Sequence, residues 1–436
     1  MSRSPKNLSK KQDRYDRFIL FYKSRISHLR FLQIHKTICF YQSLKNDQVL
    51  ALLTLFIWLI LFLAYIIPIH TSFDGTLLTT NLSFTYSGKE EKLFLDSVES
   101  IQQINIKGML PSITLEGKFT STDPVLRAKL SSQKQIKITF PSSKSRIIFE
   151  PKDPSQASEL SLNELQLRPN TTVNNLAYQS QLHSLKFCIN ALFKEVCEQP
   201  SKSEFNRNEI ANLELQLGTQ PLSLSLKDAS ISSIGNATEQ IIMYTPIADT
   251  LNISLQSPTQ LIINLSKTSK PEPEKAESKE TKAKSSEPDI EALSEYLWGD
   301  LEVKNVQFSR TKINPADTSD HKTFSTIQEG KIRIQSQALE LQPQQFLIFP
   351  NSETSITKLR DLRIEPKASN GIRTYFTGST DRIAIGHYPK LPIQEIKVNR
   401  LSQFPTEFIS AFLALLGAFT GVLLPRLFPT ETQSKP

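Results

Sequence analysis

The sequence predicts a membrane-anchored, mainly β protein in which two transmembrane helices flank two antiparallel, β-rich, sandwich-like modules. An uncharged apolar run lies near each end of the 436-residue chain, and the long region between the runs alternates apolar and polar residues. Apolar helical runs of about 20 residues are long enough to span a hydrocarbon core. Alternation with a period of two is typical of strands with one buried face.

The N-terminal tail, residues 1–48, is basic, with eleven Lys and Arg against three Asp, a net charge of +8. Aromatic and aliphatic residues recur there at spacings of three and four, which outlines an amphipathic basic helix. Such a helix can lie on an anionic membrane, with lipids as its partner. The cations of this membrane-surface helix are Arg14, Arg17, Lys23, Arg25 and Arg30. Alternatively, these cations do no more than fix the orientation of the chain. No nucleic-acid motif accompanies them, and we expect no nucleic-acid partner.

Residues 49–69 form the first predicted transmembrane helix. The run VLALLTLFIWLILFLAYIIP contains no charge, and no signal-peptidase site follows it, so it is interpreted as a signal anchor. Basic residues near a span are retained in the cytoplasm. We therefore expect an integral membrane protein with both termini cytoplasmic and an extracytoplasmic central region, which would be periplasmic in a bacterium.

Residues 70–265 are predicted to form the first β-rich module. The segments KQIKITF, LELQLG, PLSLSL, TLNISL and QLIINL all have large apolar residues at every second position. One interior helix is expected at about residues 181–198, where Leu185, Ile189, Leu192 and Val196 form an apolar stripe.

A polar segment, residues 266–289, separates this module from a second one at residues 290–405. The segment is rich in Lys, Glu and Pro and has no large apolar residue, so it cannot build a core and is expected to be a disordered linker. Alternatively, it is an excursion within a single sheet system, to which both modules contribute strands. In the second module Val306 and Phe308 resume the alternation of Leu301 and Val303 out of phase, which predicts a β-bulge.

The second predicted transmembrane helix covers residues 406–425, and a short cytoplasmic tail, residues 426–436, follows it. Small residues recur one turn apart on this helix, at Ser410, Ala414, Gly417, Ala418 and Gly421. Such rows let two helix backbones approach closely. The bulky first span lacks such a row, so we expect a second copy of the chain or another membrane or envelope protein as the helix-packing partner.

Cysteine chemistry is sparse, with three Cys in the chain. Cys188 and Cys197 could form a disulfide in an oxidising compartment. On a continuous helix, however, nine residues would place the two sulfurs on opposite faces, so the bridge requires a break between them. Two separate buried thiols are the alternative.

Catalytic and cofactor motifs are absent from the sequence. The six His are scattered, and no phosphate-binding glycine loop or nucleophile elbow is present. We therefore expect no enzyme activity, no cofactor and no metal. The architecture favours a noncatalytic scaffold or assembly factor of the cell envelope that acts at the membrane surface. The alternative is a lipid- or glycan-binding module accessory to an envelope transport or export system.

Overall fold

The computed structural model describes residues 46–108, 110–191, 209–232, 234–256, 258–266, 299–314, 317–350, 354–365, 371–400 and 404–427. These residues divide into two compact units. The first contains two helices from the two ends of the chain, and the second, Ile69–Val398, contains the β-strands. Each unit is described by itself below.

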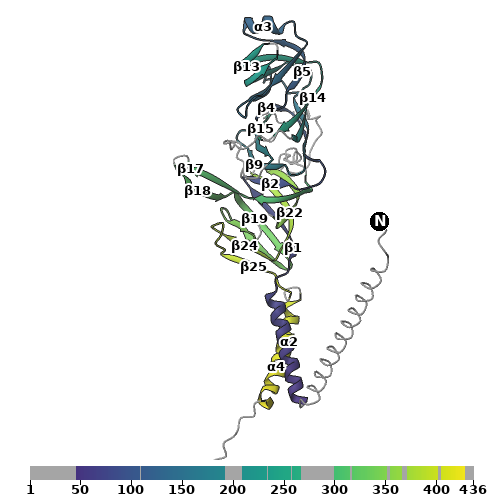
Figure 1. Cartoon of the computed structure of the whole chain (residues 1–436), viewed down its shortest axis with the longest axis vertical. Helices are drawn as coiled ribbons and strands as arrows, with labels where there is room; N and C mark the ends of the chain where they lie inside the picture. The colour runs from purple at the N-terminus through teal and green to yellow at the C-terminus, as the bar shows by residue number, and fades with distance from the viewer. Residues whose placement is uncertain are drawn as a thin grey trace, which may run out of the picture. The chain divides into compact units, whose positions relative to one another are not determined.

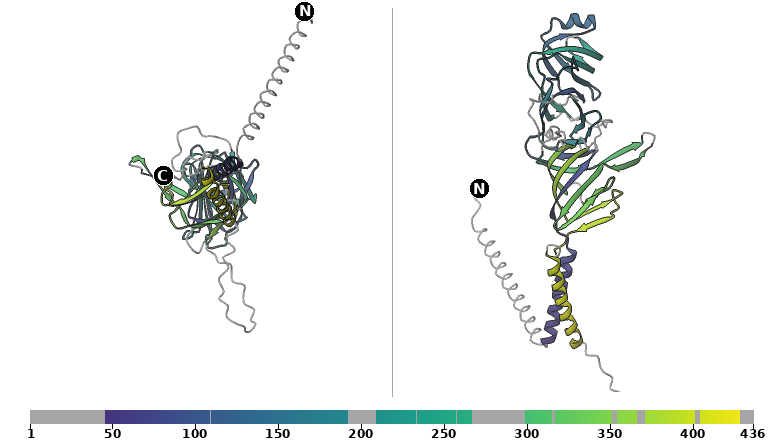
Figure 2. Two further views of the ribbon diagram at one scale, coloured as in Figure 1. Left: turned by 90° about the horizontal axis from the view of Figure 1, so that it is seen from below. Right: turned by 180° about the vertical axis from the view of Figure 1, so that it is seen from behind.

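In the first unit α2 (Asn46–Ile66) and α4 (Thr406–Leu427) lie side by side (Figures 1 and 2). Thr54 and Leu416 are buried, and the backbone N–H of Arg400 donates to the carbonyl of Ala64 at 3.2 Å. Most other described side chains on both helices are exposed, including Phe56, which is 60% exposed.

No helix within the described residues has an apolar stretch long enough to cross a membrane. The predicted two-pass integral membrane protein, with transmembrane helices at 49–69 and 406–425, cytoplasmic termini and an extracytoplasmic centre, is contradicted by this finding. An uncharged run is not by itself evidence of a span, because a helix that packs within a protein can have the same composition.

The second unit is mainly β, as the alternation predicts, and its largest sheet has 16 strands. In spatial order the first ten are β13 (Gly235–Pro246), β5 (Ile113–Thr120), β6 (Gln135–Thr139), β12 (Leu222–Ile231), β7 (Arg146–Pro151), β4 (Ile101–Gly108), β15 (Thr259–Leu265), β10 (Ser184–Asn190), β9 (Thr172–Gln179) and β2 (Leu82–Tyr86). The sheet continues with β16 (Leu301–Gln307), β22 (Ile356–Glu365), β23 (Gly371–Thr380), β1 (Thr71–Thr79), β19 (Ile327–Ile334) and β20 (Gln337–Leu341). The alternation of buried and exposed residues is clearest on β5, where Ile113, Leu115 and Phe119 face the core.

One end of this sheet closes on itself, because β13 pairs with β12 as well as with β5. The strands β13, β5, β6 and β12 therefore form a small closed ring. Helix α3 (Pro124–Leu130), which contacts β5, begins at Asp123, whose carboxylate accepts hydrogen bonds from the N–H groups of Val125 and Leu126. Closure leaves no free strand edge at this end of the sheet.

A four-stranded sheet pairs β14 (Thr250–Gln256), β11 (Glu209–Gln216), β8 (Ser161–Leu167) and β3 (Lys92–Val98) in that order. Its buried face packs on the long sheet through aromatic rings. Phe94 of β3 lies edge-on to Phe84 of β2 and to Phe187 of β10, with ring centroids 5.8 Å apart in both pairs. All three rings are buried, which gives this region the two-layer core of a sandwich.

A three-stranded sheet, β21 (Phe346–Ile348), β24 (Arg382–Gly386) and β25 (Gln394–Lys397), belongs to the same core through Ile383, Ile385 and Ile396. Nearby, Phe349 stacks on Phe73 of β1 at 5.3 Å. The strands β17 (Ser309–Asn314) and β18 (Asp317–Ser325) form a separate two-stranded ribbon, visible as a projecting hairpin in Figure 1.

The long sheet mixes strands from the beginning and from the end of the second unit's sequence. β1, at the beginning of this unit, lies between β19 and β23, which come from its C-terminal part. β2 pairs with β16.

The predicted linker, residues 266–289, lies outside the described residues except for Ser266. The predicted bulge in β16 is confirmed by the register shift between Lys304 and Gln307.

The predicted helix at residues 181–198 is wrong where the structure describes it. Residues 184–190 form β10, paired on both sides with β9 and β15. Leu185 and Ile189, four residues apart, share one face in a strand as well as in a helix, so their spacing does not separate the two. Phe187 between them is also buried, which fits the period of two.

Candidate functional site

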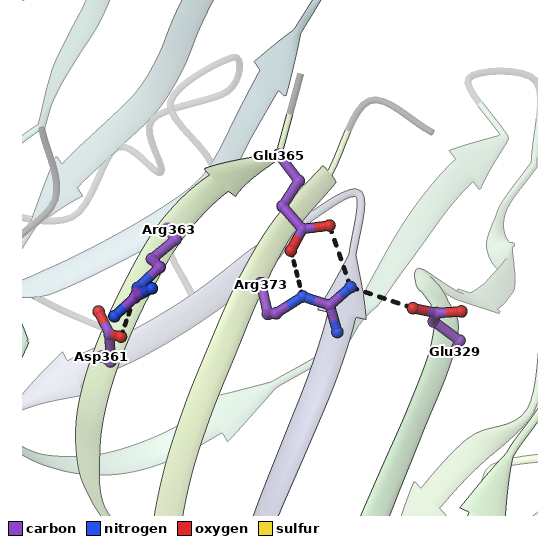
Figure 3. A network of polar contacts seen from close by, with 5 residues as sticks. All are labelled: Glu329, Asp361, Arg363, Glu365 and Arg373. Atoms are coloured by element: carbon purple, nitrogen blue, oxygen red, sulfur yellow. Dashed lines mark hydrogen bonds and ion pairs between the residues drawn. The ribbon is translucent and has the colours of Figure 1, made fainter. Parts of the chain in front are cut away.

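Charged residues gather on the solvent-facing side of β22, β23, β1, β19 and β20. The alternation of each strand places its apolar residues in the core and these polar residues outside. Figure 3 shows the centre of this charged face, where Arg373 of β23 binds both Glu365 of β22 and Glu329 of β19, the latter at 3.1 Å. These two carboxylates raise the pKa of Arg373, so its guanidinium remains charged.

Other cations on or beside the charged face also have carboxylate partners. Arg363 and Arg373 are cross-strand neighbours, a like-charge arrangement that is unfavourable by itself. Arg363 pairs with Asp361 at 2.6 Å (Figure 3), which offsets the repulsion. Lys331 pairs with Glu340 at 2.9 Å, and its hydrogen bond lowers the pKa of that carboxyl.

A depression of about 750 Å³ lies on the charged face. Arg333 of β19 and Arg360 of β22 line it together with Asp74 of β1 and Tyr375 of β23. All four side chains are exposed. Within the described part of the chain, neither arginine makes an ion pair with a carboxylate. The depression is therefore a solvent-open surface lined by two arginines and one exposed aromatic ring.

A second hollow of about 350 Å³ lies over β8, β11 and β14. Its polar lining includes Glu164, Glu214, Asn212 and Asn252. Glu214 accepts a hydrogen bond from the amide of Asn163 at 2.9 Å, and Glu164 accepts one from Gln166 at 2.5 Å. The acids of this hollow are thus partly occupied by amide partners and are not arranged as a free acid–base pair.

The ribbon β17–β18 is the third candidate. Its two strands pair with each other and with no third strand among the described residues. Arg310 is opposite Phe324 in the register, and Lys322 is two residues from Phe324, so these three residues share one face. All three are exposed, Phe324 by 48%. Thr311 and Thr323 lie on the other face and approach each other at 3.3 Å.

The predicted helix-packing residues Ser410, Ala414, Gly417, Ala418 and Gly421 all lie on α4 and are exposed. At Gly417 and Gly421 an added Cβ would meet no atom within 4 Å. α2 therefore does not pack closely against these two glycines. Use of the row by a second copy or another protein remains a prediction.

The predicted membrane-surface residues Arg14, Arg17, Lys23, Arg25 and Arg30 lie outside the described residues, as does Cys197. Cys188 lies on β10, is 2% exposed and is disulfide-bonded. The pairing of Cys188 with Cys197 therefore remains a prediction. Because β10 is a strand, the helical geometry that argued against the bridge does not apply at Cys188.

Sequence reasoning missed Arg333, Arg360, Asp74 and Tyr375. The signal that could have found them is their position in an alternating strand, because the polar positions of such a strand face outward. It does not give the strand order that brings four separate segments to one surface. Among the described residues, no group of three or more His, Cys, Asp or Glu is placed to hold a metal ion. The absence of a cofactor remains a prediction.

Comparison with known protein families, characterised proteins and solved structures found no match to this chain. The candidate sites are therefore interpreted from their own geometry and chemistry.

Proposed function

We propose that this protein is a noncatalytic scaffold or assembly factor, and that the ribbon β17–β18 binds an acidic, extended segment of a partner protein. The observation that carries the proposal is the ribbon itself, a two-stranded sheet with exposed Arg310, Lys322 and Phe324 on one face. The interaction is strand addition, in which the partner segment hydrogen-bonds to a free ribbon edge.

The backbone supports this reading. An isolated two-stranded hairpin is only marginally stable in water, because its outer N–H and C=O groups are unpaired and it has little apolar burial. A third strand would pair one row of these groups. Thr311, Thr323 and Lys322 are exposed, so in the described residues nothing covers the ribbon at these positions.

The side chains indicate the chemistry of the partner. Arg310 and Lys322 would attract carboxylates, and charge complementarity would raise the association rate and select against basic segments. Phe324, on the same face, provides an aromatic anchor of the kind enriched at binding hot spots. An acidic segment with one or two apolar residues fits this combination.

The alternative of a lipid-binding module beside a transport system needs an apolar cleft between the sheets. The two hollows described above have mixed polar and apolar linings and are open to solvent, and neither is an apolar cleft between sheets. Scaffolding is therefore the better-supported function.

The test is affinity purification of the full-length tagged chain from its native cells, followed by mass spectrometry. The native chain is compared with the double variant Arg310→Glu and Lys322→Glu. The control is Lys118→Glu with Lys137→Glu, which makes the same charge change at exposed positions of β5 and β6. We expect a stoichiometric partner that is lost with the ribbon variant and kept with the control.

Hydrogen exchange then locates the contact. Addition of the purified partner should slow amide exchange in β17 or β18, because strand addition protects edge N–H groups. A partner retained equally by both variants, or the absence of any stoichiometric partner, would overturn the proposal.

A further inference from the structure

We propose that the depression on the charged face binds an acidic oligosaccharide, with Arg333 and Arg360 holding its acidic groups and Tyr375 stacking on a sugar ring. This site is separate from the β17–β18 ribbon, and the inference does not depend on the scaffold function.

The two arginines form no ion pair with a carboxylate of the described residues, whereas Arg363, Arg373 and Lys331 each do. Asp74 is the cross-strand neighbour of Arg333 without forming such a pair. A guanidinium presents a planar fork of N–H donors that matches carboxylate and sulfate oxygens. Two such forks in one depression form a receptor for a ligand with two anionic groups.

Spacing sets the size of the ligand. Arg360 is on β22 and Arg333 on β19, with β23 and β1 between them. At about 4.8 Å per strand the two strands are roughly 14 Å apart. The cross-strand row Arg333, Asp74, Thr377 ends at Lys358 on β22, two residues from Arg360, so the two arginines lie across the sheet rather than along one strand. A single sugar is too short to reach both, whereas a short oligosaccharide is long enough.

The remaining lining indicates a sugar rather than a peptide. Hydroxyl and amide groups surround the arginines, at Thr71, Ser72, Thr76, Gln335, Thr357 and Thr377. They are suited to a ligand with many hydroxyls, because each can both donate and accept hydrogen bonds. The Asp74 carboxylate is an acceptor for sugar hydroxyls, and it also lowers the net positive charge of the site.

Tyr375 provides the stacking surface and is 37% exposed. An aromatic ring on a polar surface offers apolar area to the C–H face of a sugar. The phenyl rings that line the same depression, Phe73 and Phe376, are 3% and 1% exposed and belong to the core. The lining of the depression thus contains one exposed ring and no aliphatic side chain, which favours a saccharide over an acidic peptide with apolar residues.

The experiment is isothermal titration calorimetry with the purified full-length protein. The probes are tetragalacturonate, its neutral analogue tetragalactose, and a polyaspartate peptide of equal charge. We expect tetragalacturonate to bind and the other two to bind at least tenfold more weakly. Because charge-assisted hydrogen bonds are worth about 1.5–3 kcal/mol, Arg333→Gln and Arg360→Gln should each weaken binding roughly ten- to hundredfold.

Two variant pairs make the test specific. Tyr375→Phe keeps the ring and should retain affinity within about threefold, while Tyr375→Ala should lose roughly tenfold. Lys118→Gln and Lys137→Gln, on β5 and β6, remove charge elsewhere and should have no effect. Circular dichroism confirms that each variant is folded before titration.

Three results would overturn the proposal. They are no binding of tetragalacturonate, binding that both arginine variants leave unchanged, and equal or tighter binding of polyaspartate, which would assign the depression to an acidic peptide. Because no partner protein is present in the titration, failure here leaves the ribbon proposal intact. Loss of a partner with the ribbon variant likewise does not affect the titration.

Discussion

The ring of Phe376 on β23 covers Gly75, its cross-strand partner on β1. A Cβ added at Gly75 would lie 2.5 Å from the ring carbon Cζ, closer than real Cβ contacts allow. The relationship is reciprocal, because Phe73 on β1 covers Gly378 on β23 in the same way. The two rings meet edge to face at 6.3 Å. The two glycines therefore leave room for each aromatic ring to lie over the neighbouring strand.

Gly75→Val should destabilise the second unit by about 1–3 kcal/mol, because the added methyl groups force the Phe376 ring out of its packed position. Urea denaturation followed by fluorescence measures the change. Phe376→Leu in the same chain should reduce the cost of Gly75→Val, since the residues are in contact and their effects are then coupled. Ser379→Val, at an exposed position of β23, is the control. Additive effects of the two substitutions would contradict the packing argument.

Phe94→Ala should destabilise the protein by about 3–5 kcal/mol, the range observed for removal of a buried aromatic ring. Phe94 is fully buried and contacts Phe84 and Phe187, so its loss leaves a cavity between the two sheets. Val125→Ala removes apolar atoms from a 66% exposed position and should change stability by less than about 0.5 kcal/mol. Equal effects of the two variants in thermal denaturation would show that the sheet interface is not packed as described.

Tyr244 should make stability fall at alkaline pH. Burial, followed by the nearby charge of Glu116, raises the pKa of Tyr244 to about 12. The unfolded chain, with a pKa near 10, therefore loses this proton first. Stability from the neutral tyrosine is complete below about pH 10 and is lost as the pH rises toward 12. The phenol also donates to the Glu116 carbonyl at 3.0 Å.

Denaturant titrations of the native protein and of Tyr244→Phe at several pH values between 9 and 12 measure this effect. The variant should lose part of the alkaline decline, because phenylalanine has no proton to release. Ionisation of Tyr244 at an ordinary pKa, seen in the ultraviolet absorbance of tyrosinate, would rule out the proposed cause.

Glu159 should contribute stability that disappears in acid. Its carboxylate accepts hydrogen bonds from the N–H of Thr219 at 2.6 Å, the hydroxyl of Thr219 at 3.1 Å and the N–H of Gln220 at 3.2 Å. These bonds, that from the Thr219 N–H above all, lower the pKa of Glu159 below its usual 4.5. The contribution is therefore complete above the unfolded pKa and is lost as the pH falls through the folded one.

Glu159→Gln should lower the urea midpoint near neutral pH and converge with the native protein in progressively more acidic buffers. Glu239→Gln serves as the control, because the exposed Glu239 side chain makes no hydrogen bond among the described residues. A difference between native and Glu159→Gln that is constant with pH would show that the lost stability does not come from the ionised carboxylate.

Several local features followed from the sequence alone. The alternation at residues 136–140, 213–217 and 222–226 predicted apolar positions that are buried. The phase change after Val303 predicted a bulge that the register confirms. Such features are local, because the direction of a side chain in a strand depends on its position within that strand. The helix predicted at 181–198 failed because Leu185 and Ile189 fit both periods and only pairing with β9 and β15 decides between them.

The tertiary structure decided which strands are neighbours. Alternation marks Asp74, Arg333, Arg360 and Tyr375 as outward-facing, but it carries no information on which strand lies beside which. That β1 lies between β19 and β23, more than 240 residues away in the chain, is a consequence of non-local packing. The depression on the charged face exists only because of this pairing. In this protein the sequence by itself determined the strictly alternating strands and their buried faces, whereas long-range strand pairing decided β10 and assembled the surface proposed to bind an acidic ligand.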